Sequence, residues 1–250
     1  MSNSGGRRRR GLRAGVIAAI AAAIAAAAAV ALSDKISGSP TRPAPSDEAR
    51  PTLMLLTSLP IVFGEQFSLD QLGSPALKAL EQRFRVVPIS LADAANLGDG
   101  RLLLMAHPLA QPAEALVELD EWVRSGGRLL LLADPALDWH SDRPLGDRHR
   151  PPPMFADTGL LRHWGVVLEA PEERGPRLGE LGGLPILTVS PGILSGRCPV
   201  SRDRLVARCI VGEGRATIVA DADFLNIEDL DGPTQHNLDA LVEELAAISQ

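Results

Sequence analysis

Residues 101–135 read RLLLMAHPLAQPAEALVELDEWVRSGGRLLLLADP, and this stretch decides the fold because it contains a complete strand, helix and strand. Its two ends, residues 102–106 and 128–133, are short apolar runs without alternation, which is typical of strands covered on both faces of a parallel sheet. Between them, apolar residues recur at helical spacing at positions 112, 116, 119 and 123, and Gly126-Gly127 suits a helix end. The stretch therefore predicts two parallel strands joined by a right-handed helical crossover.

Two further strands and a helix are expected before this unit. Residues 52–56 and 85–89 are short apolar runs, and the segment between them has helical spacing. Ser74 is the predicted N-cap of that helix, with Pro75 in its first position. The alternation of strands and helices is typical of an α/β fold.

The residues after the central unit indicate β structure and a closing helix. Residues 205–211 and 216–220 predict an antiparallel hairpin, because a Gly-rich turn separates them. Residues 169–183 are charged and predicted to be irregular, and Thr234 is the predicted cap of the last helix. We expect a mostly parallel sheet with an antiparallel β edge.

Ligands of parallel sheets bind beyond the carboxyl ends of the strands. The sequence places polar side chains directly after four of the predicted strands, or in the loop that follows. The candidate binding residues are therefore Ser58, Glu65, His107, Asp134, Asp221 and Asp223.

The acidic stretch at residues 221–226 resembles a calcium loop only superficially. An EF-hand loop needs an oxygen ligand at its fifth position and Gly at its sixth, where this chain has Leu225 and Asn226. We predict no metal site here. Asp221 and Asp223 either brace the following turn or contact a ligand.

Catalytic and cofactor motifs are missing from the sequence. No G-x-S-x-G elbow occurs, and the chain has no GxGxxG, P-loop or HExxH motif, so no cofactor is predicted. Ser58, His107 and Asp134 could line one crevice, which leaves a hydrolase as an alternative, although nothing in their spacing selects them.

Cys198 and Cys209 are the two cysteines of the chain. Outside the cytoplasm they would form a disulfide, worth about 3 kcal/mol for a loop of this length. Two inert thiols are the alternative, and a metal-binding or catalytic role is a third reading.

The N-terminal region reads as a membrane-targeting segment. Residues 1–13 form an Arg-rich tail, residues 14–32 are an uncharged apolar run long enough to span a bilayer, and residues 33–51 form a Pro- and Ser-rich linker. The arginines should stay cytoplasmic, which places residues 52–250 in the periplasm of a Gram-negative host, anchored to the inner membrane. Cleavage of a signal peptide after residues 29–31 is the alternative, giving a soluble periplasmic protein.

Charge argues against nucleic-acid binding. The formal net charge is −6, and five arginines precede the apolar run, so the rest of the chain carries −11. A domain of that sign would repel a phosphate backbone. Aromatic residues are only 3% of the chain, so platforms for stacking bases are also scarce.

Three phrases carry a family resemblance: LLLMAHP at 102–108, LDEWVRSGGRLLLLADP at 119–135 and GEGRATIVADADFLN at 212–226. Over residues 51–250 the chain resembles the periplasmic domain of ABC-type uncharacterised transport system proteins, which are related to the gliding-motility auxiliary proteins. The resemblance implies a flavodoxin-like sheet with helices on both faces, similar to that of class I glutamine amidotransferases. Those enzymes place a nucleophilic Cys where this chain runs Leu132-Ala133-Asp134-Pro135, so the resemblance implies a scaffold without that chemistry.

We therefore expect a non-catalytic, membrane-anchored binding domain, accessory to an ABC-type transport or cell-envelope system. An ABC permease and its ATPase are the partners that the resemblance implies. The alternatives are a periplasmic hydrolase that uses Ser58 or an unrecognised nucleophile, and a structural spacer whose crevice is filled by its own side chains.

Overall fold

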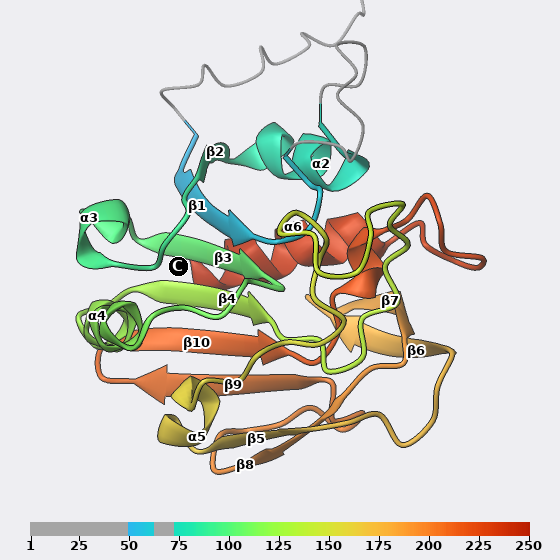
Figure 1. The fold of residues 1–250 in the computed structure, drawn as a ribbon. Coiled ribbons are helices and arrows are strands. Elements are labelled where there is room, and N and C mark those ends of the chain that lie inside the picture. The colour runs from blue at the N-terminus through green and yellow to red at the C-terminus, as the bar shows by residue number, and fades with distance from the viewer. Residues whose placement is uncertain (1–49, 63–72) are drawn as a thin grey trace, which may run out of the picture. The chain divides into compact units, whose positions relative to one another are not determined.

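The computed structural model describes residues 50–62 and 73–250, and a six-stranded sheet runs through the middle of that part (Figure 1). Its strand order is β2-β1-β3-β4-β10-β9. All neighbours pair in parallel except β9, which pairs antiparallel with β10 at one edge. The strands are β1 (Thr52–Thr57), β2 (Arg85–Pro88), β3 (Leu102–Ala106), β4 (Arg128–Leu132), β9 (Val206–Val211) and β10 (Gly214–Val219). The predicted α/β class, with a mostly parallel sheet and an antiparallel edge, is confirmed.

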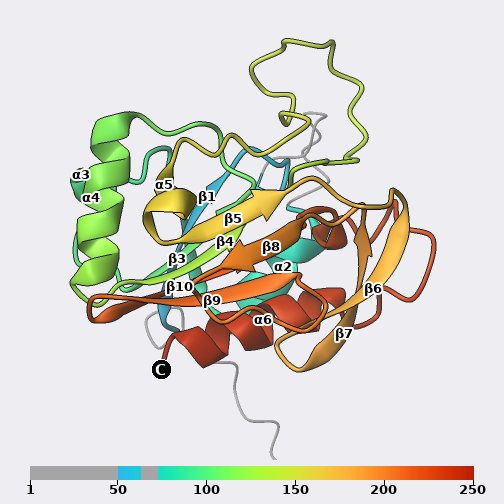
Figure 2. The ribbon, with the colours of Figure 1, turned by 90° about the horizontal axis from the view of Figure 1, so that it is seen from below.

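Helices cover both faces of this sheet. Helices α3 and α4 lie on one side, and α2 and α6 pack against each other on the other side (Figure 2). Their bounds are Pro75–Arg83 for α2, Ala94–Leu97 for α3, Ala113–Arg124 for α4 and Asn237–Ile248 for α6, while the short α5 covers Leu160–His163.

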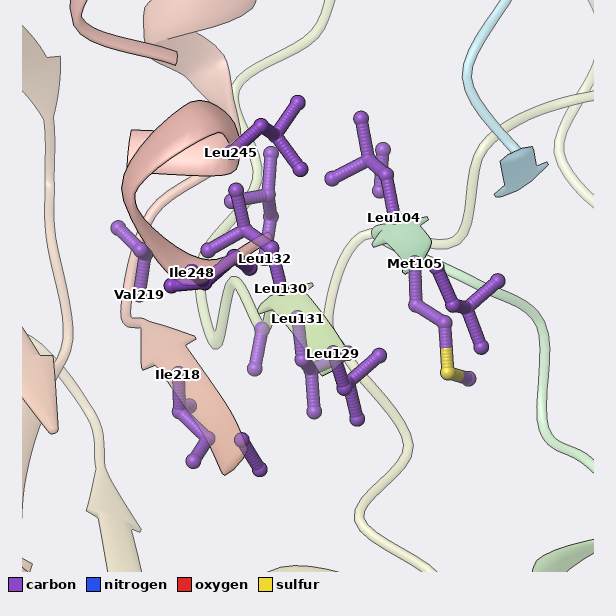
Figure 3. Packing of buried hydrophobic residues seen from close by; sticks show 14 of the residues in the cluster. Leu104, Met105, Leu129, Leu130, Leu131, Leu132, Ile218, Val219, Leu245 and Ile248 are labelled. Carbon is purple, nitrogen blue, oxygen red and sulfur yellow. The ribbon is translucent and has the colours of Figure 1, made fainter. Parts of the chain in front are cut away.

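The core forms because β3 and β4 are apolar on both of their faces. Leu130 and Leu132 of β4 point toward α6, where they meet Leu245 and Ile248, while Leu129 points to the opposite face (Figure 3). Burying one such leucine contributes about 1.5–3 kcal/mol to the stability of the fold. Because β4 has leucines on both faces, this contribution is largest when the strand lies in the interior of the sheet. The continuous apolar runs of the sequence follow from this position.

Two small antiparallel sheets lie outside the main one. Strand β5 (Val166–Glu169) pairs with β8 (Ile193–Gly196), and β6 (Pro176–Leu181) pairs with β7 (Leu184–Val189). Residues 169–183 are thus not irregular as predicted, since they contain β6. The β6–β7 ribbon lies at the carboxyl end of the main sheet (Figure 1), where it contacts the 3-10 turn η2 (Asp223–Leu225) and α6.

The two predicted helix caps have opposite outcomes. Ser74 accepts a hydrogen bond from the backbone N–H of Leu77 and Pro75 opens α2, as predicted. Helix α6 instead begins at Asn237 with His236 as its N-cap, so the prediction of Thr234 is wrong. Asn237 is fully buried and bonds to β7, which fixes where the helix starts.

Most of the N-terminal predictions fall on residues 1–49, which lie outside the described residues. These include the Arg-rich tail, the apolar segment at 14–32 and nearly all of the linker. Within residues 50–62 and 73–250, no helix is both long and apolar enough to cross a membrane.

Candidate functional site

The carboxyl ends of β4 and β10 bring three aspartates together. Asp134 follows β4, while Asp221 and Asp223 follow β10, which is the direct neighbour of β4. One carboxylate oxygen from each lies within 4.8 Å of the others, and all three side chains are buried. The sheet thus assembles an acidic cluster from residues almost ninety positions apart.

Asp134 braces the loops around it. Its Oδ1 accepts the backbone N–H of Ala136 at 2.8 Å, and its Oδ2 accepts that of Ala222 at 2.9 Å. Burial raises the pKa of Asp134 to about 6, although these hydrogen bonds act in the opposite direction. Asp134 is therefore a structural tie between the β4 and β10 loops.

Asp221 joins the small ribbon to the main sheet. Its Oδ2 accepts the N–H of Val189 in β7 at 3.0 Å, and its Oδ1 accepts the N–H of Phe224 at 3.0 Å. Burial raises the pKa of Asp221 well above its ordinary value, and the neighbouring charges of Asp134 and Asp223 raise it further. Both oxygens of this carboxylate are thus engaged, as in Asp134.

Asp223 differs from the other two because only one of its oxygens has a partner. Its Oδ2 accepts the backbone N–H of Asp138 at 2.9 Å, whereas its Oδ1 is buried and has no hydrogen-bond partner among residues 50–62 and 73–250. The side chain is only 2% exposed. Burial, followed by the charge of Asp134, raises the pKa of Asp223 to about 8. A half-satisfied buried carboxylate is costly, so Oδ1 marks this residue for a further role.

A cavity of about 280 Å³ opens next to Asp223. Its walls come from the loop after β4, from the β6–β7 ribbon, and from η2 with the loop that follows it. The lining residues are Asp138, His140, Pro176, Leu187, Val189, Asp223, Asn226, Asp229, Leu230 and Asp231. Of the five predicted residues that the structure describes, only Asp223 lines this cavity. Asp229 and Asp231 were not selected from the sequence. The several acidic residues that follow Asp223 closely in the sequence were a signal that could have identified them.

Ser58 and His107 lie side by side, but they do not form a catalytic pair. The hydroxyl of Ser58 donates to the backbone carbonyl of His107 and not to its ring. The ring is fully buried, its Nε2 lies 2.9 Å from the carbonyl oxygen of Pro152, and its Nδ1 has no partner among the residues that the structure describes. Burial lowers the pKa of His107, so the ring is neutral at pH 7 and Nε2 carries the proton. Glu65, the remaining predicted residue, lies outside the described residues.

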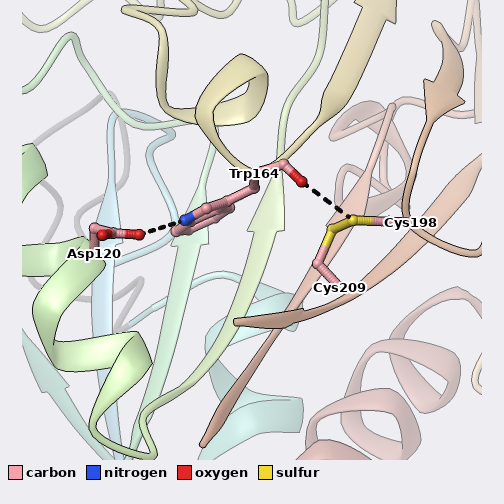
Figure 4. Close-up of a disulfide and its surroundings, with 4 residues drawn as sticks. All are labelled: Asp120, Trp164, Cys198 and Cys209. Carbon is pink, nitrogen blue, oxygen red and sulfur yellow. Dashed lines mark hydrogen bonds between the residues drawn. A yellow bond between two sulfur atoms is a disulfide. The ribbon is translucent and has the colours of Figure 1, made fainter. Parts of the chain in front are cut away.

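Cys198 and Cys209 form a disulfide in the structure, with Cα atoms 5.0 Å apart (Figure 4). The bond holds the segment around Pro199 against the outer edge of β9, where the N–H of Arg208 donates to the Pro199 carbonyl at 2.9 Å. Trp164 lies beside the bridge, and its indole N–H donates to Asp120 at 2.7 Å. The disulfide thus covers part of an edge strand that would otherwise present unpaired backbone groups.

A larger cavity, of about 870 Å³, lies next to the disulfide. Its lining combines apolar groups such as Ile210 with the arginines Arg197, Arg208 and Arg215. Arg208 is paired with Glu244 at 2.7 Å. This basic and apolar surface is chemically distinct from the acidic cavity beside Asp223.

No protein-family model matches the chain, and no curated protein matches it. Among solved structures, the chain is similar to the mmIFT52 N-terminal domain, with a TM-score of 0.52 and 14% identity over 80% of this chain and 97% of that one. It also aligns with an exo-β-1,4-mannosidase of Opitutaceae bacterium strain TAV5 at a TM-score of 0.47 and 16% identity, over 80% of this chain but only 36% of the mannosidase. A cytoplasmic protein of Salmonella typhimurium gives a TM-score of 0.48 at 11% identity, over 79% of this chain and 98% of that one. At these identities the similarities concern the fold alone, and only the first is strong enough to support a shared fold.

Proposed function

We propose that this chain is a non-catalytic binding domain, held at the outer face of the inner membrane and accessory to an ABC-type transport or cell-envelope system. The observation that carries the binding role is the cavity of about 280 Å³ at the carboxyl edge of the sheet, which is lined by Asp223, a residue whose buried Oδ1 has no partner in the described part of the chain. Open space beside a buried polar atom suits a ligand better than a spacer, whose crevice would be filled by its own side chains.

The geometry of Ser58 and His107 argues against the hydrolase alternative. A serine nucleophile needs its hydroxyl within reach of a histidine ring nitrogen. Here the hydroxyl is committed to a main-chain carbonyl, and the ring is buried against Pro152. A binding role needs no such pair.

The proposed fold family is flavodoxin-like. Numbered along the chain, the five parallel strands run 2-1-3-4-5, which is the flavodoxin-like order, and β9 is added at the edge. The resemblance of three sequence phrases to periplasmic domains of ABC-type systems points the same way. Such a scaffold normally binds ligands at the carboxyl edge, where this cavity lies.

The extracytoplasmic location is supported by the disulfide. Bonds such as Cys198–Cys209 form and persist in oxidising compartments and are rare in the cytosol. Together with the Arg-rich tail and the apolar run at 14–32, this favours a domain on the periplasmic side of an inner-membrane anchor.

Affinity purification of the full-length protein from its native membrane tests the proposal. We expect mass spectrometry to recover an ATPase and a permease, and N-terminal sequencing to find the anchor uncleaved. A soluble, cleaved protein without partners would overturn the accessory role. The Ser58→Ala variant addresses catalysis, because loss of a cellular phenotype in this variant while it remains folded would favour the hydrolase.

A further inference from the structure

We propose that the cavity beside Asp223 binds a divalent cation, and that the cation is Ca²⁺, with Oδ1 of Asp223 as its innermost ligand. This inference rests on the proposed binding role of the same cavity and names its ligand class. The acidic cluster alone would not carry it, because Asp134 and Asp221 spend both oxygens on backbone N–H groups.

The first support is the unpartnered oxygen. Buried carboxylate oxygens are almost always hydrogen-bonded, and Asp134 and Asp221 follow this rule completely. Oδ1 of Asp223 is buried without a partner in a side chain that is 2% exposed and that lines the cavity. A cation in the cavity would satisfy this oxygen.

The second support is uncompensated negative charge. Besides the buried Asp223, three of the ten lining residues are exposed aspartates, namely Asp138, Asp229 and Asp231, and none of the ten is Lys or Arg. Among the described residues of the cavity, only the side chain of His140 could carry a positive charge, and it lies 3.3 Å from Asp142. The protein itself therefore does not neutralise the wall of this cavity.

The donor set selects the type of metal. Carboxylates and the amide of Asn226 are hard oxygen ligands, which Ca²⁺ and Mg²⁺ prefer, whereas thiolate ligands are absent from the lining. Mg²⁺ demands a nearly ideal octahedron, while Ca²⁺ accepts irregular sites of six to eight oxygens. Asp138, Asp229 and Asp231 are exposed and come from two different loops, so the irregular geometry of Ca²⁺ suits them better.

Asp134 and Asp221 are positioning residues in this site. They fix the backbone around Asp223 by accepting the N–H groups of Ala222 and Phe224 on its two sides. One carboxyl oxygen of each lies within 4.8 Å of an oxygen of Asp223, so this support of the backbone is immediately behind the ligand residue.

Calorimetric titration of CaCl₂ into the full-length, EDTA-treated protein in detergent tests the site, with ionic strength held constant by KCl. We expect one Ca²⁺ per chain, with a dissociation constant of about 10⁻⁴ M, as for other extracellular calcium modules. Asp223→Asn should weaken binding by about 10-fold or more, because it removes a charged ligand but keeps an oxygen for the Asp138 N–H. The matched control is Asp99→Asn, an exposed aspartate that does not line the cavity, and its affinity should be unchanged.

A second variant guards against misfolding. Asp229 and Asp231 line the cavity and are exposed, so the double variant Asp229→Asn/Asp231→Asn should fold normally and still weaken Ca²⁺ binding. The proposal is overturned if Ca²⁺ does not bind, if Mg²⁺ binds more tightly than Ca²⁺, or if both the Asp223 variant and the double variant bind like the wild type. Recovery of partner proteins does not depend on this titration, so a negative result here would leave the accessory role standing.

Discussion

Replacing Asp223 by Asn should stabilise the metal-free protein at neutral and alkaline pH. The pKa of Asp223 is about 8 in the folded protein, against 3.8 for the free side chain, because burial penalises the charged form. Between these pH values the folded state holds more protons than the unfolded state, so the free energy of unfolding of the wild type must fall as the pH rises. This stabilising protonation is complete below about pH 4 and is lost as the pH passes 8.

The size of this effect on the free energy of unfolding follows from the gain of one proton on folding. A single group changes the free energy of unfolding by up to about 1.4 kcal/mol per pH unit, so Asp223 alone costs the wild type on the order of 5 kcal/mol between pH 4 and pH 8. Asn cannot ionise and avoids this loss. It also removes a negative charge that raises the pKa of Asp221, which lowers the cost of ionising that neighbour. Both effects favour the variant more as the pH rises.

The assay is urea unfolding in EDTA at pH 5, 6, 7 and 8, followed by fluorescence of the three tryptophans. Between pH 5 and pH 7 the difference in unfolding free energy, Asn variant minus wild type, should grow by about 1.4 kcal/mol for each pH unit. Titrating groups remote from Asp223 are common to both proteins and cancel in this difference, whereas the lower cost of ionising Asp221 in the variant adds to it. If the unfolding free energies of the variant and the wild type change in parallel with pH, the reasoning is refuted, because Asp223 then does not gain a proton on folding.

Three further predictions concern stability away from the acidic cavity. Replacing both Cys198 and Cys209 by Ser should cost about 3 kcal/mol in urea unfolding, because the bridge closes a loop over a sequence separation of 11. Gly214→Ala should lower the melting temperature strongly, by several degrees, because its new Cβ would lie 1.8 Å from the backbone oxygen of Val123 in α4. Asn237→Leu should cost about 3 kcal/mol or more, measured by urea unfolding, because it strands one N–H and two carbonyl groups that now bond to the buried amide.

The central strands could be predicted because their signals are local. The runs at 102–106 and 128–133 are apolar at every position but Arg128, and the helix between them has its own periodicity and a Gly-Gly end. The structure places β3 and β4 there with almost the same bounds. A strand that is buried on both faces needs apolar residues at every position, so it can be recognised from its own sequence without knowledge of distant residues.

Strand β6 could not be predicted for the opposite reason. Within the described part of the chain it pairs with β7 alone in an exposed ribbon, and of residues 176–181 only Leu181 is buried. A strand that packs one side chain needs no alternation of apolar and polar residues. The start of α6 escaped prediction in a similar way, because the bonds from Asn237 to Leu187 and Phe224 depend on tertiary contacts.

The sequence predicted where the three aspartates lie, but not which of their oxygens are hydrogen-bonded. The rule that ligands meet the carboxyl ends of parallel strands placed Asp134, Asp221 and Asp223 at one edge, and the pairing of β4 with β10 brings them together. Whether each carboxylate is satisfied depends on backbone donors that no local pattern reveals. Asp221 receives the N–H of Val189, 32 residues away, and Asp223 receives that of Asp138, 85 residues away.

The number of hydrogen bonds that each carboxyl group accepts distinguishes the two structural aspartates from the proposed ligand Asp223. Asp134 and Asp221 are buried acids whose carboxyl oxygens all accept backbone N–H groups. These hydrogen bonds fix the surrounding loops and offset the free-energy cost of burying the two side chains. Asp223 has the same burial but leaves one oxygen unused beside open space, in a cavity wall without Lys or Arg. Asn would hold the same loop through its carbonyl oxygen and would avoid the buried charge. A carboxylate at this position is therefore better explained by a cation that it binds than by the fold that it supports.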